Sequence, residues 1–221
     1  MGFILCLDTL LIPFSLFLTL GYHVYLWKCF KKKPSSTQFG LEKLRRNTWF
    51  QEIKQGDNKK GMLAVQSLRN TLMATILTAT IAILVNLALA ALTNNTYNAS
   101  HLLKAEIFGS HSKWVYSLKY GSTSLFLLVS FFCCSVAIGF LIDANFLINA
   151  SSLDEDDDQF SSDPCYTQTI FERGFGLALV GNRVLCVSFP MLLWMLGPLP
   201  VALSSGALVW GLYGLDFASA R

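Results

Sequence analysis

The feature that most constrains this chain is a series of long apolar windows that contain almost no charged residues. The windows cover residues 3–27, 66–92, 121–148, 171–196 and 201–216. A helix needs about 20 mostly apolar residues to cross a hydrocarbon layer roughly 30 Å thick. Only 14% of the residues are charged, against about 25% in soluble domains. The sequence therefore predicts an all-α polytopic membrane bundle of five spans, forming a single membrane domain over residues 1–221.

The charges are unevenly distributed, and their distribution predicts an orientation. Eleven of the 17 Lys and Arg residues fall between Lys28 and Arg69, and six of the 14 acidic residues fall between Asp154 and Asp163. Basic loops favour the cytoplasmic side. We therefore expect the basic loop 28–61 and the acidic loop 151–164 to be cytoplasmic, with the N-terminus outside and the C-terminus inside. Because spans flank the basic loop, we expect it to meet anionic lipids and not nucleic acid.

Segment 93–119 is then the predicted external loop. It carries two N-glycosylation sequons, which begin at Asn94 and Asn98 and agree with an external location. The run Gly197-Pro198-Leu199-Pro200 interrupts the apolar pattern and separates the fourth span from the fifth. Four spans remain the alternative if the segment around Arg183 does not cross the membrane.

The basic loop contains a predicted helix of its own, from Phe39 to Gln55. Pro34 to Ser36 is typical of a turn, and Thr37 is a suitable residue to cap the helix. Apolar residues recur at roughly helical spacing with Lys and Arg between them. This pattern predicts an amphipathic helix lying along the inner leaflet, and the alternative is a helix packed on the cytoplasmic ends of the spans.

Polar and ionisable residues inside the spans form a candidate site, because each costs several kcal/mol in lipid and is retained for a reason. These intramembrane residues are His23, Arg69, Asn70, Asp143, Arg183 and Asp216. Arg183 lies near the middle of the fourth span. One interpretation is a buried ion pair of Arg183 with Asp143 or Asp216 that fixes helix packing. The other is a polar pathway or anionic-ligand site that opens inward.

Signatures of catalysis are missing from the sequence. It contains no H-E-x-x-H, no G-x-S-x-G and no phosphate-binding loop, which are motifs with known chemical mechanisms. Asp154, Asp156 and Asp158 have the spacing of calcium ligands, but the glycine and glutamate that complete an EF-hand are replaced. We therefore predict no catalytic residue, no metal site and no cofactor.

Several short motifs spread along the chain resemble those of a known family. They are Tyr22-His23, Pro34-x-x-Thr37-x-x-Gly40, Arg46-x-x-Trp49, the run from Leu63 to Asn70, Gly181-Asn182-Arg183, Trp194-x-x-Gly197-Pro198 and the run from Leu212 to Phe217. The chain is similar to domain of unknown function 599, a family of small multi-span proteins of plants and bacteria, and most similar to its plant branch. The resemblance implies that Arg69, Asn70, Arg183 and Asp216 belong to the family's polar framework. It implies no activity, because the family has none established.

Three classes of function follow from these expectations. The first is a non-catalytic interaction protein or accessory subunit of a membrane assembly, acting as a homo- or hetero-oligomer. The second is a small oligomeric transporter or channel with an inward-facing polar site around Arg183. An intramembrane lipid enzyme is the third. The spans and sequons indicate the plasma membrane or an endomembrane.

Overall fold

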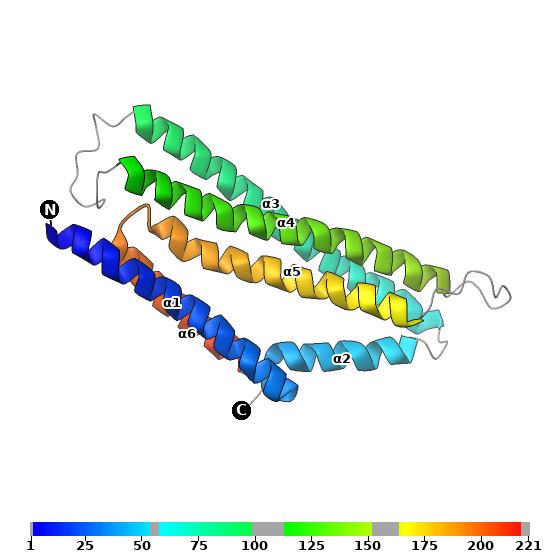
Figure 1. Cartoon of the computed structure of the whole chain (residues 1–221). Coiled ribbons are helices and arrows are strands. Elements are labelled where there is room, and N and C mark those ends of the chain that lie inside the picture. Colours follow the sequence, from blue (N-terminus) through cyan, green and yellow to red (C-terminus); the bar gives the residue numbers. More distant parts are fainter. Residues whose placement is uncertain (1, 54–57, 99–112, 152–163, 218–221) are drawn as a thin grey trace. The chain divides into compact units, whose positions relative to one another are not determined.

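The computed structural model describes residues 2–53, 58–98, 113–151 and 164–217, and in these ranges the chain is helical and forms no strand (Figure 1). The elements, in chain order, are α1 (Gly2–Lys32), η1 (Pro34–Ser36), α2 (Gln38–Ile53), α3 (Asn58–Asn98), α4 (Lys113–Ser151), α5 (Pro164–Leu193) and α6 (Pro198–Asp216). The predicted all-α class is confirmed.

Five of these helices are long and apolar enough to cross a membrane. The apolar segments are Leu10–Lys32, Met62–Asn94, Ser117–Asn149, Tyr166–Leu193 and Pro198–Asp216. The fourth contains Arg183, and the structure agrees with the five predicted spans. The predicted break before the fifth span is also confirmed. Gly197 has a φ of 145°, a conformation that favours glycine, and Pro198 then starts α6 at a position where proline costs no hydrogen bond.

The central helices are longer than the apolar windows. α3 has 41 residues and α4 has 39, which corresponds to about 60 Å of helix at 1.5 Å per residue. Both therefore extend beyond a hydrocarbon layer of roughly 30 Å. The predicted external segment 93–119 is helical at both ends, because α3 continues to Asn98 and α4 begins at Lys113. Polar residues end an apolar window without ending the helix.

The chain divides into two compact units, and each is described by itself. The first consists of Met1–Leu44, Leu84–Leu127 and Val184–Arg221, and the second of Arg45–Ile83 and Leu128–Arg183. We refer to them as unit 1 and unit 2. Four of the helices pass from one unit to the other along their length, so each unit contains parts of several helices.

In unit 1, α1 and α6 lie side by side and run in the same direction (Figure 1). Early in both helices, Ile12 and Val201 share one buried cluster. Towards the ends of both helices, Leu26 and Leu212 share another. A pair of parallel helices has both starts on one side of a membrane and both ends on the other.

The turn that follows α1 is tightly built around one threonine and one glycine. Thr37 is fully buried, and its Oγ1 accepts a hydrogen bond of 3.2 Å from the backbone N–H of Gly40. Thr37 is therefore the predicted cap of α2. The Cα of Gly40 rests against the carbonyl group of Pro34, so that a Cβ added at position 40 would lie 1.8 Å from that oxygen.

Unit 2 has an apolar core to which four helices contribute. Its buried members are Phe50, Ala64, Leu68, Ala144, Ile148, Ile170 and Phe171. The ring of Phe171 lies 5.8 Å from that of Phe50 and 4.7 Å from that of Phe175, between ring centroids. Because Phe50 of α2 is only 4% exposed, the later half of α2 is packed against other helices.

Also in unit 2, α4 and α5 approach each other closely at glycines. The hydroxyl of Ser130 donates a hydrogen bond of 2.7 Å to the carbonyl oxygen of Gly181. A Cβ at Gly181 would lie 2.5 Å from the Sγ of Cys134, and one at Gly174 would lie 3.0 Å from the side chain of Leu141. Small residues at helix contacts are the usual means of close packing in membranes, where apolar burial provides little driving force. The order of these contacts makes α4 and α5 antiparallel.

Candidate functional site

The most deeply buried ionisable group of the predicted site is Asp216, at the last residue of α6. Its side chain is 1% exposed, and one carboxylate oxygen accepts a hydrogen bond from the hydroxyl of Tyr22 in α1. Leu26 and Leu212 are buried in the same cluster as Tyr22. A buried carboxylate is costly unless it is hydrogen-bonded, so the Tyr22 hydroxyl stabilises Asp216 and ties α6 to α1.

His23 lies directly after Tyr22, and the two rings meet edge to face at 5.5 Å between centroids. The Nδ1 of His23 is 2.7 Å from the carbonyl oxygen of Thr19. Because a carbonyl can only accept, Nδ1 must carry the proton, and a neutral ring then leaves Nε2 as an acceptor. Nε2 is buried and has no hydrogen-bond partner among the described residues. This nitrogen can therefore accept a hydrogen bond.

The other four predicted residues belong to unit 2. Arg69 and Asn70 on α3 and Asp143 on α4 are exposed, whereas Arg183 on α5 is partly buried. The structure thus brings His23 and Asp216 together with Tyr22 in unit 1, and it places Arg69, Asn70, Asp143 and Arg183 in unit 2. The pairing of Arg183 with one of the two carboxylates stays a prediction.

The sequence reasoning missed a second buried charge in unit 1, Lys119. It is 3% exposed, and its Nζ lies 5.6 Å from the centre of the Trp194 ring. One turn later, the hydroxyl of Thr123 donates to the carbonyl oxygens of Lys119 and Met191, at 2.8 and 3.1 Å. Lys119 falls at the end of the predicted external loop. The signal that could have found it is its helical spacing to Thr123 and Leu127, which are both buried.

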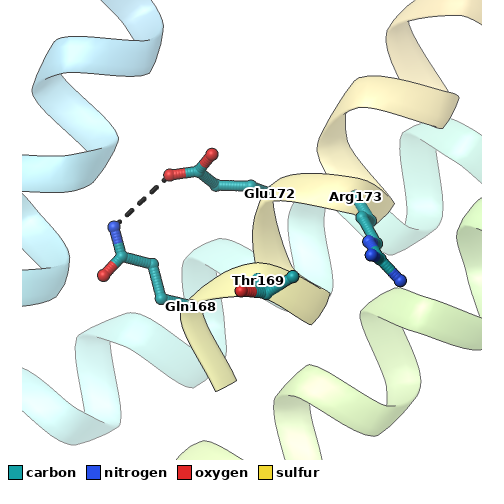
Figure 2. Close-up of a pocket in the computed structure, with 4 residues that line it drawn as sticks. All are labelled: Gln168, Thr169, Glu172 and Arg173. Atoms are coloured by element: carbon teal, nitrogen blue, oxygen red, sulfur yellow. Dashed lines mark hydrogen bonds between the residues drawn. The ribbon is translucent and has the colours of Figure 1, made fainter. Parts of the chain in front are cut away.

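A polar pocket opens at the start of α5 (Figure 2). Its volume is about 480 Å³, and its described lining residues are Gln168, Thr169, Glu172 and Arg173. The amide of Gln168 donates a hydrogen bond of 3.3 Å to the carboxylate of Glu172, while Arg173 points away from both (Figure 2). The pocket offers charges of both signs on a single helix, which suits a polar contact with a neighbouring molecule.

A comparison with known protein families identifies the chain's relatives. The family model described as protein of unknown function, DUF599, matches residues 10–221. The chain belongs to this family. The comparisons with curated proteins and with solved structures returned no match. The match includes all six predicted framework residues, and it carries no assigned chemistry.

Two further predictions for this DUF599 protein concern N-glycosylation at Asn94 and Asn98 and the binding of a metal ion. Asn94 is exposed near the end of α3, and Asn98 is the last residue of that helix. Across the ranges that the structure describes, His, Cys, Asp and Glu form no group of three that could hold a metal ion. The acidic loop 151–164 lies almost wholly outside the described residues.

Proposed function

We propose that this integral membrane protein is a non-catalytic interaction protein, an accessory subunit of a larger membrane assembly. The observation that carries the proposal is that its buried polar side chains form hydrogen bonds between helices. Tyr22 bonds to Asp216, and Ser130 bonds to the backbone of Gly181. The hydroxyl of Ser124 likewise donates a hydrogen bond of 2.8 Å to the side chain of Asn86.

Such bonds are a means of fixing helices in lipid. An unsatisfied polar group in hydrocarbon costs several kcal/mol, whereas an interhelical hydrogen bond stabilises a membrane protein by about 0.6 to 2 kcal/mol. Groups committed to helix pairs in this way support a structural role for the buried polar residues. They lend less support to a site that must bind and release a substrate.

The apolar surface supports the same proposal. In each of the five spans only 22–28% of the most apolar window is buried. Large side chains such as Phe17 and Trp210 are 75% and 81% exposed. This surface is available to lipid and to other membrane helices, as an accessory subunit requires.

We further propose that the N-terminus is outside and the C-terminus cytoplasmic, in the plasma membrane or an endomembrane. The parallel arrangement of α1 and α6 supports termini on opposite sides. At the end of α1, Lys31 lies over the Trp27 ring, with Nζ 5.5 Å from its centre, and Lys32 and Lys33 are exposed. An aromatic ring followed by lysines is typical of a cytoplasmic boundary facing anionic lipid.

This orientation predicts which ends of the protein are accessible in intact cells or sealed vesicles. An N-terminal tag is expected to be labelled from the non-cytoplasmic side, and a C-terminal tag only from the cytosol. The Asn94→Gln, Asn98→Gln double variant is expected to remove a glycan shift detected by endoglycosidase digestion, with Asn182→Gln, in the fourth span, as the control. An N-terminal tag labelled only from the cytosol would contradict the orientation.

The proposed function is tested by gentle extraction of the tagged protein from native membranes into nanodiscs, followed by affinity purification and mass determination. We expect a heterologous membrane protein in stoichiometric amount. A transporter is the second candidate, because Arg183 lies in the fourth span with its Nη1 atom buried. Solute or ion flux in liposomes that is lost in Arg183→Ala and kept in Arg45→Ala, at an exposed position of α2 outside the spans, would favour the transporter and overturn the accessory role.

A further inference from the structure

Three charged side chains lie on the outside of unit 2 at a common depth along its helices. Each is exposed and within two residues of a member of the buried core of that unit. They are Arg69 beside Leu68, Asp143 beside Ala144, and Arg173 near Phe171. Since the three core residues belong to one cluster, the three charges lie at a common depth along α3, α4 and α5.

That depth is close to the edge of the hydrocarbon layer. Asp143 is less than two turns from the end of its span at Asn149, and Arg173 is about two turns from the start of its span at Tyr166. Within the described part of the chain, neither side chain forms an ion pair or hydrogen bond with another residue. A charge exposed near lipid is stabilised by a partner of opposite charge or by headgroups.

The surface around Asp143 has the shape of a helix contact. Ser135, Gly139 and Asp143 follow each other at four-residue spacing and are all exposed, so they share one face of α4. We call it the Asp143 face. A Cβ added at Gly139 would meet nothing within 4 Å. Two small residues at this spacing let a second helix approach closely.

An equivalent surface surrounds Arg173 on α5. Thr169, Arg173, Gly176 and Val180 alternate at four- and three-residue spacing and are exposed, which is the spacing of a helix seam. We call it the Arg173 face. Gly176 also has open space where a Cβ would be. Gly176 lies three residues after Arg173, which is about one helical turn. Gly139 is likewise about one turn from Asp143 on α4.

We propose that the Asp143 face of one copy of this chain docks on the Arg173 face of a second copy. α4 and α5 are antiparallel, so Gly139, which precedes Asp143, and Gly176, which follows Arg173, lie on the same side of the charges. Copies inserted in the same orientation would therefore match acid to base and glycine to glycine. The opposite charges decide the occupant, because the chain carries both halves of the contact.

The contact joins different faces of the two copies, so it is heterologous, and its repetition generates a ring where the rotation between copies closes. On α4, Asp143 is two residues from Leu141, which faces α5, and two residues correspond to about 200° around a helix. The Asp143 face therefore points away from α5 of its own chain. The inference deepens the proposed function, since it names one partner in the assembly.

The experiment uses two versions of the full chain with different tags, co-expressed and extracted into nanodiscs. Wild-type copies are expected to co-purify. Asp143→Arg alone and Arg173→Asp alone are each expected to reduce this recovery at least tenfold, because like charges then meet. Co-expression of the Asp143→Arg chain with the Arg173→Asp chain is expected to restore it to within twofold of wild type. In that mixture every contact between unlike chains again has one acid and one base.

The rescue separates a contact between copies from a pairing within one chain, because neither variant can repair its own charges. Gly139→Leu is expected to reduce recovery, whereas Gly214→Leu, at an exposed and equally open glycine of α6, is the matched control. Single-charge variants that co-purify like wild type, or a mixture that is not rescued, would overturn the proposal. So would variants that lose only co-purified anionic lipid. A monodisperse single copy with a foreign partner would overturn the self-contact and leave the proposed function standing.

Discussion

Gly40→Ala is expected to lower the free energy of unfolding by about 3 kcal/mol, at the upper end of the usual range for overpacking. The added methyl carbon would lie 1.8 Å from the carbonyl oxygen of Pro34. Backbone atoms cannot rotate away as a flexible side chain can, so η1 or the first turn of α2 has to move. Any such movement also stretches the bond between the Gly40 N–H and Thr37. Unfolding in mixed micelles with increasing SDS measures the loss.

The matched control is Gly21→Ala in α1, where an added Cβ meets nothing within 4 Å. Alanine is a better helix former than glycine by about 1 kcal/mol, so this variant is expected to be unchanged or slightly more stable. Hydrogen exchange localises the effect, with faster exchange expected in the first turn of α2 in Gly40→Ala only. Equal stability of the two variants would show that the Pro34 contact is not tight.

Tyr22→Phe is expected to destabilise the protein by about 1.5 to 3 kcal/mol, the range for a hydrogen bond to a charged group. The substitution removes only the hydroxyl and leaves the Asp216 carboxylate buried without that donor. Asp216→Leu is expected to cost a similar amount by leaving the hydroxyl without its acceptor. In the double variant both polar groups are gone, so its loss is expected to fall short of the sum by 1 kcal/mol or more, as for neighbouring residues in contact.

Tyr213→Phe serves as the control, since Tyr213 lies on α6 near Asp216 and is 50% exposed. Its loss of a hydroxyl is expected to change stability by less than about 0.5 kcal/mol. The same unfolding measurement applies to all four variants. Strict additivity of Tyr22→Phe and Asp216→Leu would mean that the two side chains do not stabilise each other.

The fold was largely predictable because the bilayer imposes a simple rule on sequence. Apolar windows gave the five spans, and Gly197 with Pro198 gave the last break. Thr37 was identified as a cap from its residue type alone. Helix length was not predictable from hydropathy, because α3 and α4 continue into polar sequence where intrahelical hydrogen bonds no longer depend on lipid. The burial of Phe50 also required tertiary contacts that no local pattern contains.

The sequence predicted which residues belong to the candidate site, but not which of them lie together. His23 and Asp216 were singled out by their cost in a membrane, and the structure places both in unit 1. The donor to Asp216 is Tyr22, which is 194 residues away in the chain. Tyr22 was noted as part of a family motif, but nothing in the sequence paired it with Asp216. Lys119 was missed because a lysine at the edge of an apolar window is normally solvated.

The pairing of α1 with α6 has a consequence for how the protein is made. α1 leaves the ribosome before α6, and Tyr22 precedes Asp216 by 194 residues. At about 5 to 20 residues per second, α1 waits roughly 10 to 40 s for its neighbour. During that time Tyr22 and Leu26 have no α6 to cover them. The packing of α1 is therefore completed only once α6 has been made.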